Sequence, residues 1–338
     1  MSRPDDASDR AVLLCGDLGR ETCGVGASEA AALHAVEPRP ATVDPRRIGA
    51  SLGAVVRARR AGRPVVVAYP TRSTVSSLRA TATLALAAVA GRGRLRWHLH
   101  EYTIFGERRA LLDLLLVIGG GRVVVSTESE ADALRRSRGG RVARRVDVRV
   151  LPPANGTPLR AVEGRPADPP VVGLFGTARA DKGLDVAVAA LRALHDAAPT
   201  GTVRVETVGE GWDEAPWPAD VAALPLAHHG RVPTPDLAPL LSRWSLAIAP
   251  FAAGATDGRM SLRTPLTCGV PTLTTLDHPA DLTLRPPHLL LDPATAGARA
   301  LATGPAERAA GAACVARFEA DAVRRLADAL WAIDGEPA

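Results

Sequence analysis

Short apolar runs alternate with helical segments along the chain, and the alternation occurs twice. The apolar runs predict strands at 11–19, 63–70, 94–102, 122–129 and 146–156, and again at 171–176, 203–209, 246–251 and 271–275. The segments between them predict helices at 46–60, 73–90, 106–119 and 129–137, and again at 182–197, 235–243 and 261–268. Repeated strand–helix units in two halves predict an α/β protein with two Rossmann-like, doubly wound parallel sheets.

A proline-rich, charged stretch separates the two halves and predicts a linker. We expect a first domain over residues 1–160, a linker over 161–170, a second domain over 171–314, and a C-terminal amphipathic helix over 315–338 that packs back on the first domain. Ligands of doubly wound sheets bind at the carboxyl ends of the strands. The sequence therefore predicts a ligand site in the cleft between the halves.

The composition limits the choice of partners. The formal net charge of +5 could favour an anionic partner such as a nucleotide or a membrane surface. The 41 cationic and 36 anionic residues are mixed, and no basic run interleaves with aromatic residues, so nucleic-acid binding is not expected. The four cysteines form no CxxC pair, and the polar N-terminus does not resemble a signal peptide. These features predict a cytoplasmic protein with reduced thiols and, at most, peripheral membrane association.

Lys182 is the only lysine of the chain, because the other 40 of the 41 cationic residues are arginines. It follows the strand predicted at 171–176 and opens a predicted helix. A helix N-terminus attracts phosphate through its unpaired N–H groups, and a lysine there adds a compact positive charge. Lys182 is therefore a candidate ligand of a diphosphate. The alternative is a solvated lysine that pairs with Asp181.

Two further groups of candidates lie in the first half. His98 and His100 share one face of the strand predicted at 94–102, and His100 lies nearer its carboxyl end, where it could accept a proton. It could equally be a structural histidine, or form a metal site with His98 and Glu101. The glycine-containing stretch CGVGASE could cradle a phosphate or a sugar through the backbone, or be a plain turn; its candidates are Gly24, Val25 and Gly26.

Four ordered stretches of the second half resemble the retaining GT-B glycosyltransferases of the family 4 type. These are LFGTARADKGLDVAVAALRAL (174–194), VETVGEG (205–211), HHGRVPTPDLAPLLSRWSLAIAPF (228–251) and CGVPTLTT (268–275). The resemblance implies a GT-B fold in which the second domain binds a nucleotide-sugar and the first binds the acceptor. It also implies retention of the anomeric configuration without a metal ion.

The resemblance assigns roles to single residues. Lys182 would stabilise the departing diphosphate, His100 would line the acceptor side, and the backbone at Arg231 and Val232 would contact the base. The glycines of the donor site would be Gly176, Gly209 and Gly211.

Two departures from the family pattern affect these roles. Thr177 replaces the usual arginine, and Arg179 could supply the missing cation. Thr256 and Thr264 replace the paired glutamates of the family. The stretch between them offers Asp257 for a sugar or ribose hydroxyl and Arg263 for the diphosphate or the linker. The turn at Gly258 and the helix start that follows, with Arg259, would hold the sugar and the phosphates.

The sequence thus predicts a glycosyltransferase that uses a UDP-, GDP-, ADP- or dTDP-sugar and no metal. Its acceptor would be a small molecule of specialised metabolism or a glycan. Two alternatives stay open, namely a catalytically silent GT-B homologue that acts as a partner, favoured by the lost glutamates, and a sugar-nucleotide epimerase. The sugar, the base and the oligomeric state do not follow from the sequence.

Overall fold

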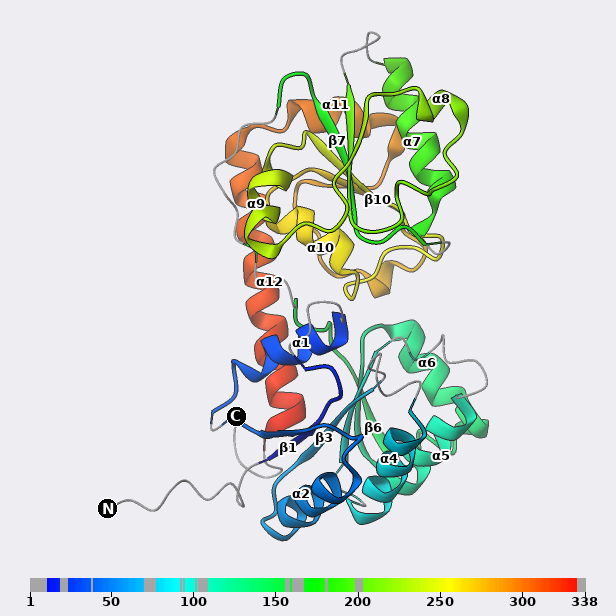
Figure 1. Ribbon diagram of the computed structural model, residues 1–338, viewed down its shortest axis with the longest axis vertical. Coiled ribbons are helices and arrows are strands. Elements are labelled where there is room, and N and C mark those ends of the chain that lie inside the picture. Colours follow the sequence, from blue (N-terminus) through cyan, green and yellow to red (C-terminus); the bar gives the residue numbers. More distant parts are fainter. Residues whose placement is uncertain are drawn as a thin grey trace, which may run out of the picture. The chain divides into compact units, whose positions relative to one another are not determined.

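The computed structural model of the protein divides the chain into two compact units. Unit 1 comprises Met1–Gly156 with Glu319–Ala338, and unit 2 comprises Thr157–Phe318. The structure describes residues 11–18, 24–37, 39–69, 77–91, 93, 95–100, 102, 109–155, 159, 167–179, 182–197 and 203–332, without the side chains of 24–27 and 194–197. Figure 1 shows the helices and strands with the labels used below.

Unit 1 is built on a six-stranded sheet in the order β2-β1-β3-β4-β5-β6, and all its neighbouring strands are parallel. Its strands are β1 (Val12–Leu14), β2 (Ala41–Val43), β3 (Val65–Tyr69), β4 (Leu95–Leu99), β5 (Gly121–Val125) and β6 (Val146–Val150). Every residue of β3 and β4 is buried. This burial on both faces explains why β3 is a continuous apolar run, whereas the equally buried β4 also contains Arg96 and His98.

Helices cover both faces of this sheet. They are α1 (Gly24–Leu33), α2 (Ile48–Arg60), α4 (Leu78–Ala90), α5 (Arg109–Gly119), α6 (Glu128–Arg136), the 3₁₀ helix η4 (Ser137–Gly140) and the end of α12 (Pro305–Trp331). One core cluster joins α2, α4, α5 and α6 to one face, and another joins α1 and α12 to the opposite face. Local signals set the helix starts: the Ser77 hydroxyl accepts from the amide of Ala80 at α4, and the Thr127 hydroxyl accepts from that of Glu130 at α6.

Unit 2 repeats the architecture with the sheet order β12-β11-β10-β7-β8-β9, again parallel throughout. Its strands are β7 (Val171–Phe175), β8 (Arg204–Val208), β9 (Leu226–His228), β10 (Leu246–Ala249), β11 (Thr272–Thr274) and β12 (Leu289–Leu290). The central strand β7 contains Gly173 because the ring of Trp244 occupies the space of its side chain. A Cβ atom there would lie 2.0 Å from Trp244 Cε3.

The helices of unit 2 also lie on both faces of the sheet. They are α7 (Leu184–Ala197), α8 (Ala219–Ala222), α9 (Thr234–Ser242), α10 (Met260–Thr267), α11 (Pro293–Ala302), the 3₁₀ helix η6 (Pro279–Asp281) and the first part of α12. The long helix α12 begins at Pro305, ten residues before the helix expected from the sequence. Its residues from Glu319 onward belong to unit 1, where Leu326 and Leu330 pack against Leu13.

The predicted fold class is confirmed, since the chain forms two parallel α/β sheets with helices on both faces. Strands 11–19 and 271–275 were expected longer than β1 and β11, which span three residues each. Among the residues that the structure describes, no helix is long and apolar enough to cross a membrane.

Candidate functional site

Lys182 lies at the carboxyl edge of the unit 2 sheet, two residues before α7. It is buried, and its Nζ atom donates to the hydroxyl of Ser261 over 2.5 Å. The same Nζ lies 4.9 Å from the ring centroid of Phe251, and Cζ of Arg259 lies 5.1 Å from that centroid. Phe251 therefore holds two cationic groups beside one ring, by cation–π attraction.

The two cations stand at the N-terminus of α10. Arg259 is the residue that precedes the helix, and Ser261 lies in its first turn, where the backbone N–H groups have no partner within the helix. The helix dipole adds a partial positive charge at this end. Lys182, Arg259 and the start of α10 thus form a local site suited to an anion with several oxygen atoms.

Two glycines let the backbone approach this site closely. A Cβ atom on Gly209 would lie 2.2 Å from the carbonyl oxygen of Gly176, so no larger residue fits at the end of β8. A Cβ atom on Gly176 would lie 3.0 Å from Cβ of Ser261 and 3.4 Å from Nζ of Lys182. Both glycines have positive φ angles, of 104° and 126° for Gly176 and Gly209. Trp212 locks the arrangement, because its indole N–H donates to the carbonyl of Gly176 over 2.5 Å.

Asp257 and Arg263 hold the loop that leads into α10. The Asp257 carboxylate accepts from the amides of Thr283 and Leu284 over 2.9–3.0 Å and from the hydroxyl of Thr283 over 2.5 Å. Arg263 is completely buried and donates to the backbone carbonyl of Asp257 over 3.0 Å. The sequence assigns Asp257 to a sugar or ribose hydroxyl and Arg263 to the diphosphate or the linker. In the structure, both side chains form hydrogen bonds with the protein's own backbone.

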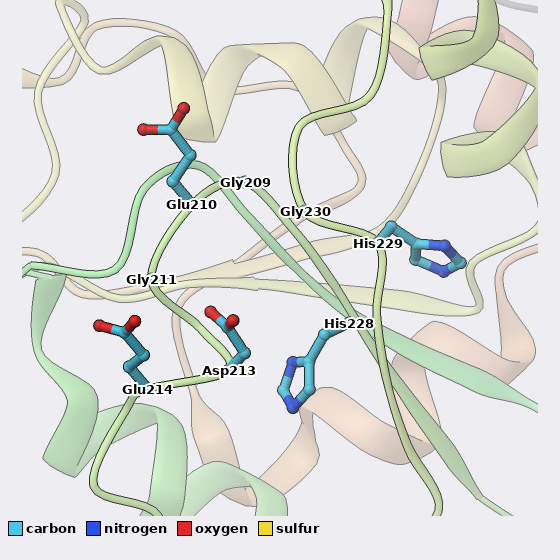
Figure 2. Close-up of a pocket in the computed structure, with 8 residues that line it drawn as sticks. All are labelled: Gly209, Glu210, Gly211, Asp213, Glu214, His228, His229 and Gly230. Carbon is cyan, nitrogen blue, oxygen red and sulfur yellow. The ribbon is translucent and has the colours of Figure 1, made fainter.

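A pocket of about 530 Å³ opens beside the ends of β8 and β9 (Figure 2). It is lined by Gly209, Glu210, Gly211, Asp213, Glu214, His228, His229 and Gly230. The amide of Gly209 donates to the carbonyl of Gly230 over 2.7 Å, which joins the two loops that form its walls. The pocket and Lys182 therefore lie at the same edge of one sheet, since Gly176 and Gly209 are in direct contact.

The other predicted donor-site residues lie around this edge. Thr177 and Arg179 are exposed on the loop after β7, and Arg231 is exposed immediately after the pocket. Val232 packs partly against the core cluster beneath α9. Gly258 forms the turn with Asp257 that precedes α10. The residues of the unit 2 prediction thus follow the carboxyl ends of β7, β8, β9 and β10.

A second polar cluster is buried in unit 1. Nδ1 of His98 and Nε2 of His100 both contact Oε1 of Glu29, and the His100 contact measures 3.2 Å. All three side chains are buried, and the two imidazole centroids are 4.1 Å apart. Both histidines lie on the face of β4 that α1 covers, as the alternation of side chains along a strand requires.

The protonation of this cluster follows from its contacts. Burial alone would raise the pKa of Glu29, but the neighbouring histidines bring it down to about 2. Burial and the charge of His98 lower the pKa of His100 to about 4, against the opposing effect of Glu29. At neutral pH the carboxylate is therefore ionised, and the His100 imidazole is neutral. Because a carboxylate only accepts hydrogen bonds, His100 must direct an Nε2–H group at it.

Glu29 is the functional candidate that the sequence did not reveal. The predicted third partner, Glu101, lies outside the described residues. The predicted glycine loop is partly replaced by helix, because α1 begins at Gly24 and includes Val25 and Gly26. Glu29, His98 and His100 offer one ligand atom each within 4.8 Å of one another, a donor set that suits a divalent transition metal.

Comparison with known proteins identifies the fold through solved structures. No protein-family model matches the sequence, and no curated protein matches it. Solved structures match over nearly the whole chain. An α-glucosyltransferase in complex with UDP and a 13-mer DNA containing an HMU base has a TM-score of 0.63 at 9% identity, over 95% of this chain and 99% of that one. The chain has the GT-B fold.

Two further neighbours show how widely this fold is used. The lipopolysaccharide outer core galactosyltransferase WaaB matches with a TM-score of 0.57 at 11% identity, over 94% of this chain and 98% of that one. The N-terminal domain of Candida albicans trehalose-6-phosphate phosphatase matches with a TM-score of 0.59 at 11% identity, over 95% and 96%. At these identities the comparison establishes the architecture, and function must be argued from the sites.

The buried histidine of unit 1 predicts a pH-dependent stability. Between pH 6.5 and about 4, His100 is protonated in the unfolded chain but not in the folded one, so stability rises with pH in this window. We expect lowering the pH from 7 to 5 to cost about 2 kcal/mol at this residue. Hydrogen exchange of β4 amides at the two pH values measures it. His100→Asn should remove this dependence, and the exposed control His34→Asn should leave it unchanged. Equal dependence in both variants would contradict the assignment.

Proposed function

We propose that the protein is a glycosyltransferase that moves a sugar from a nucleotide-sugar to a small-molecule or glycan acceptor. The observation that carries this proposal is the pair of cations, Lys182 and Arg259, at the N-terminus of α10. The GT-B neighbours named as glucosyl- and galactosyltransferases support it. The four family 4-type stretches in unit 2 favour a retaining enzyme.

Transfer requires a nucleoside diphosphate to leave the sugar carbon, and negative charge grows on the diphosphate as the bond breaks. Lys182 and Arg259 lie where they can stabilise that charge, together with the first amides of α10. Their positions are fixed before a ligand binds, because both pack beside Phe251 and Lys182 is hydrogen-bonded to Ser261. A preorganised cationic site needs little rearrangement during the reaction.

The nucleoside would occupy the pocket beside β8 and β9. In doubly wound sheets the phosphates lie at the first strand and the nucleoside extends toward the next strands. Here that direction leads from Gly176 to the pocket at Gly209 and Gly230. We assign the backbone at Arg231 and Val232 to the base, and the exposed Thr177 and Arg179 to the phosphates. UDP is the nucleotide named in the α-glucosyltransferase structure, which makes it the first to test.

Unit 1 would bind the acceptor, with His100 as the residue that meets it. The Nε2–H group of His100 is directed at Glu29, so Nδ1 carries the lone pair that can accept a hydrogen bond or a proton. The lowered pKa of about 4 keeps this lone pair available at neutral pH. Glu29 is then a positioning residue that holds the histidine in one tautomer.

One observation favours a second candidate, a catalytically silent homologue. Thr264 replaces a glutamate of the family pattern, is fully buried, and its hydroxyl has no partner among the described residues. The carboxylate of Asp257, the acidic residue of the same stretch, is bound to the amides of Thr283 and Leu284. A silent homologue would bind a nucleotide without transferring or hydrolysing the sugar.

A binding screen tests the proposal without knowledge of the acceptor. UDP, GDP, ADP and dTDP and their sugars are added to the protein, and the midpoint of thermal unfolding is measured. A ligand at 100 times its dissociation constant stabilises the protein by about 2.7 kcal/mol. Binding with donor hydrolysis supports the transferase, binding without turnover supports the silent homologue, and no binding by any nucleotide contradicts both.

We expect Lys182→Ala to abolish most transfer while the protein stays folded. Loss of one group that stabilises developing charge should raise the barrier by about 2.7–4 kcal/mol. The measurement is kcat with the donor from the screen, beside the unfolding midpoint. Lys182→Arg retains the charge and should recover part of the rate. Full activity of Lys182→Ala would remove Lys182 from the mechanism.

We expect His100→Ala to lower kcat by about 10²–10⁴-fold, the usual contribution of a general base. His98→Ala should have a much smaller effect, because His98 is fully enclosed and farther from the strand end. Glu29→Gln should change the tautomer of His100, which ¹⁵N NMR of the imidazole detects independently of activity. Equal losses in the two histidine variants would show that the cluster is structural.

We expect transfer to persist in excess EDTA. Lys182, Arg259 and the α10 N-terminus supply positive charge that a divalent cation supplies in other transferases. A modest stimulation by Mg²⁺ is compatible, since free nucleotide product binds the ion. Complete and reversible loss of activity in EDTA would instead identify a bound metal, with Glu29, His98 and His100 as its first candidate ligands.

A further inference from the structure

Positive charge is concentrated in one segment of unit 1. Residues 45–100 contain eleven arginines and no aspartate or glutamate. This segment has a formal charge of +11, while the whole chain has +5, so the other 282 residues together carry −6. The modest net charge therefore conceals a strong asymmetry between one part of unit 1 and the rest of the protein.

Exposed large apolar side chains are concentrated in the same part of the molecule. Eight such side chains are exposed among the described residues, and six of them lie on α2, α4 and α5. The six are Val56, Leu78, Leu86, Val89, Leu111 and Leu114. Single exposed leucines are common, but a group of six on adjacent helices marks an interaction surface.

The three helices form one continuous layer. All three contribute to the core cluster on a single face of the unit 1 sheet, and α4 packs between α2 and α5. Nη1 of Arg59 donates to the carbonyl of Ala90 over 2.5 Å, which ties the ends of α2 and α4 together. The three helices are labelled in Figure 1. We call their outer surface the α2–α4–α5 face.

The central helix α4 is unusual for a surface helix. Its only charged residue is Arg79, and its outward positions include Leu78, Leu86 and Val89. A helix that is apolar on its outer side as well as its inner side needs a second apolar environment. Next to it, the last turn of α2 presents the exposed residues Arg57, Arg59 and Arg60.

We propose that the α2–α4–α5 face docks the protein on a membrane surface that contains anionic phospholipids. The arginines would contact the lipid phosphates, and the leucines and valines would enter the boundary between headgroups and acyl chains. This contact is peripheral and reversible. It goes beyond the proposed transferase activity and does not depend on it.

Other partners fit this face less well. A nucleic acid would use the arginines but not the exposed leucines, and the chain offers few aromatic side chains for base stacking, since aromatics make up 3% of its residues. A second copy of the chain would bring the arginines of α2 and α4 on two such faces together. An anionic lipid surface is complementary to both the charge and the apolar character of the face.

Flotation of the full-length protein with lipid vesicles tests the proposal. One set of vesicles is pure phosphatidylcholine, and the other contains about 30% phosphatidylglycerol. We expect binding to the anionic vesicles only, and a marked loss of binding at about 0.5 M NaCl because salt screens the arginines. Equal binding to both sets, or none to either, would overturn the proposal.

Paired variants distinguish binding through the α2–α4–α5 face from non-specific attraction between the charged protein and the vesicles. Leu86→Glu with Val89→Glu should abolish binding, while Leu291→Glu with Leu301→Glu, which changes exposed residues of unit 2 and adds the same charge, should not. Arg57→Gln with Arg60→Gln should weaken binding about thirtyfold, because each arginine near an anionic surface contributes about fivefold. The charge-matched control is Arg324→Gln with Arg325→Gln on α12. Unfolding midpoints confirm that each variant is folded.

Three outcomes would assign the face to something else. If the α4 variant binds vesicles as well as its unit 2 control, the contact is not made by this face. If RNA displaces the protein from vesicles and binds with equal sensitivity to the α4 substitutions, the face is a nucleic-acid surface. If the protein is a dimer that the α4 substitutions dissociate, a second copy covers the face. The nucleotide screen is unaffected by any of these results.

Discussion

The contact between Gly209 and the carbonyl of Gly176 sets the geometry of unit 2. It brings the end of β8 against the end of β7 at a distance that only glycine permits. The loops beyond these strands consequently share one edge, with Lys182 and Ser261 on one side and the pocket on the other. Trp212 holds the end of β7 in place, because its indole N–H donates a hydrogen bond to the carbonyl of Gly176. The surroundings of Lys182 and the pocket are thus joined by one stretch of backbone contacts at this edge of the sheet.

Unit 1 buries a cluster of polar side chains in the core of its parallel α/β fold. An ionised carboxylate needs donors when it is buried, and Oε1 of Glu29 obtains them from His98 and His100, while Oε2 has no hydrogen-bond partner among the described residues. The Glu29 carboxylate in turn fixes the orientation of the two imidazole rings. A polar cluster of this kind limits the ways in which α1 can pack on β4, and so contributes to the specificity of the fold.

Most of the fold and part of the candidate site could be predicted from local patterns in the sequence. The strands β3, β7 and β10 are continuous apolar runs, and Lys182 could be placed near a helix start because the strand, the glycine and the helix follow one another along the chain. Glu29 could not be found this way, since 69 residues separate it from His98. The binding of Asp257 to the amides of Thr283 and Leu284 was also hidden, because the side chains of those partners give no sign of which backbone N–H groups need an acceptor.

The single lysine makes one side chain of the protein the target of amine-modifying reagents. Apart from the terminal amine, Lys182 carries the only primary amine of the chain, and it is nine-tenths buried beside Ser261. Reagents that acylate or reductively alkylate amines therefore address one internal position. The extent of modification would report on the occupancy of that position directly, by intact mass, with no tag or engineered label.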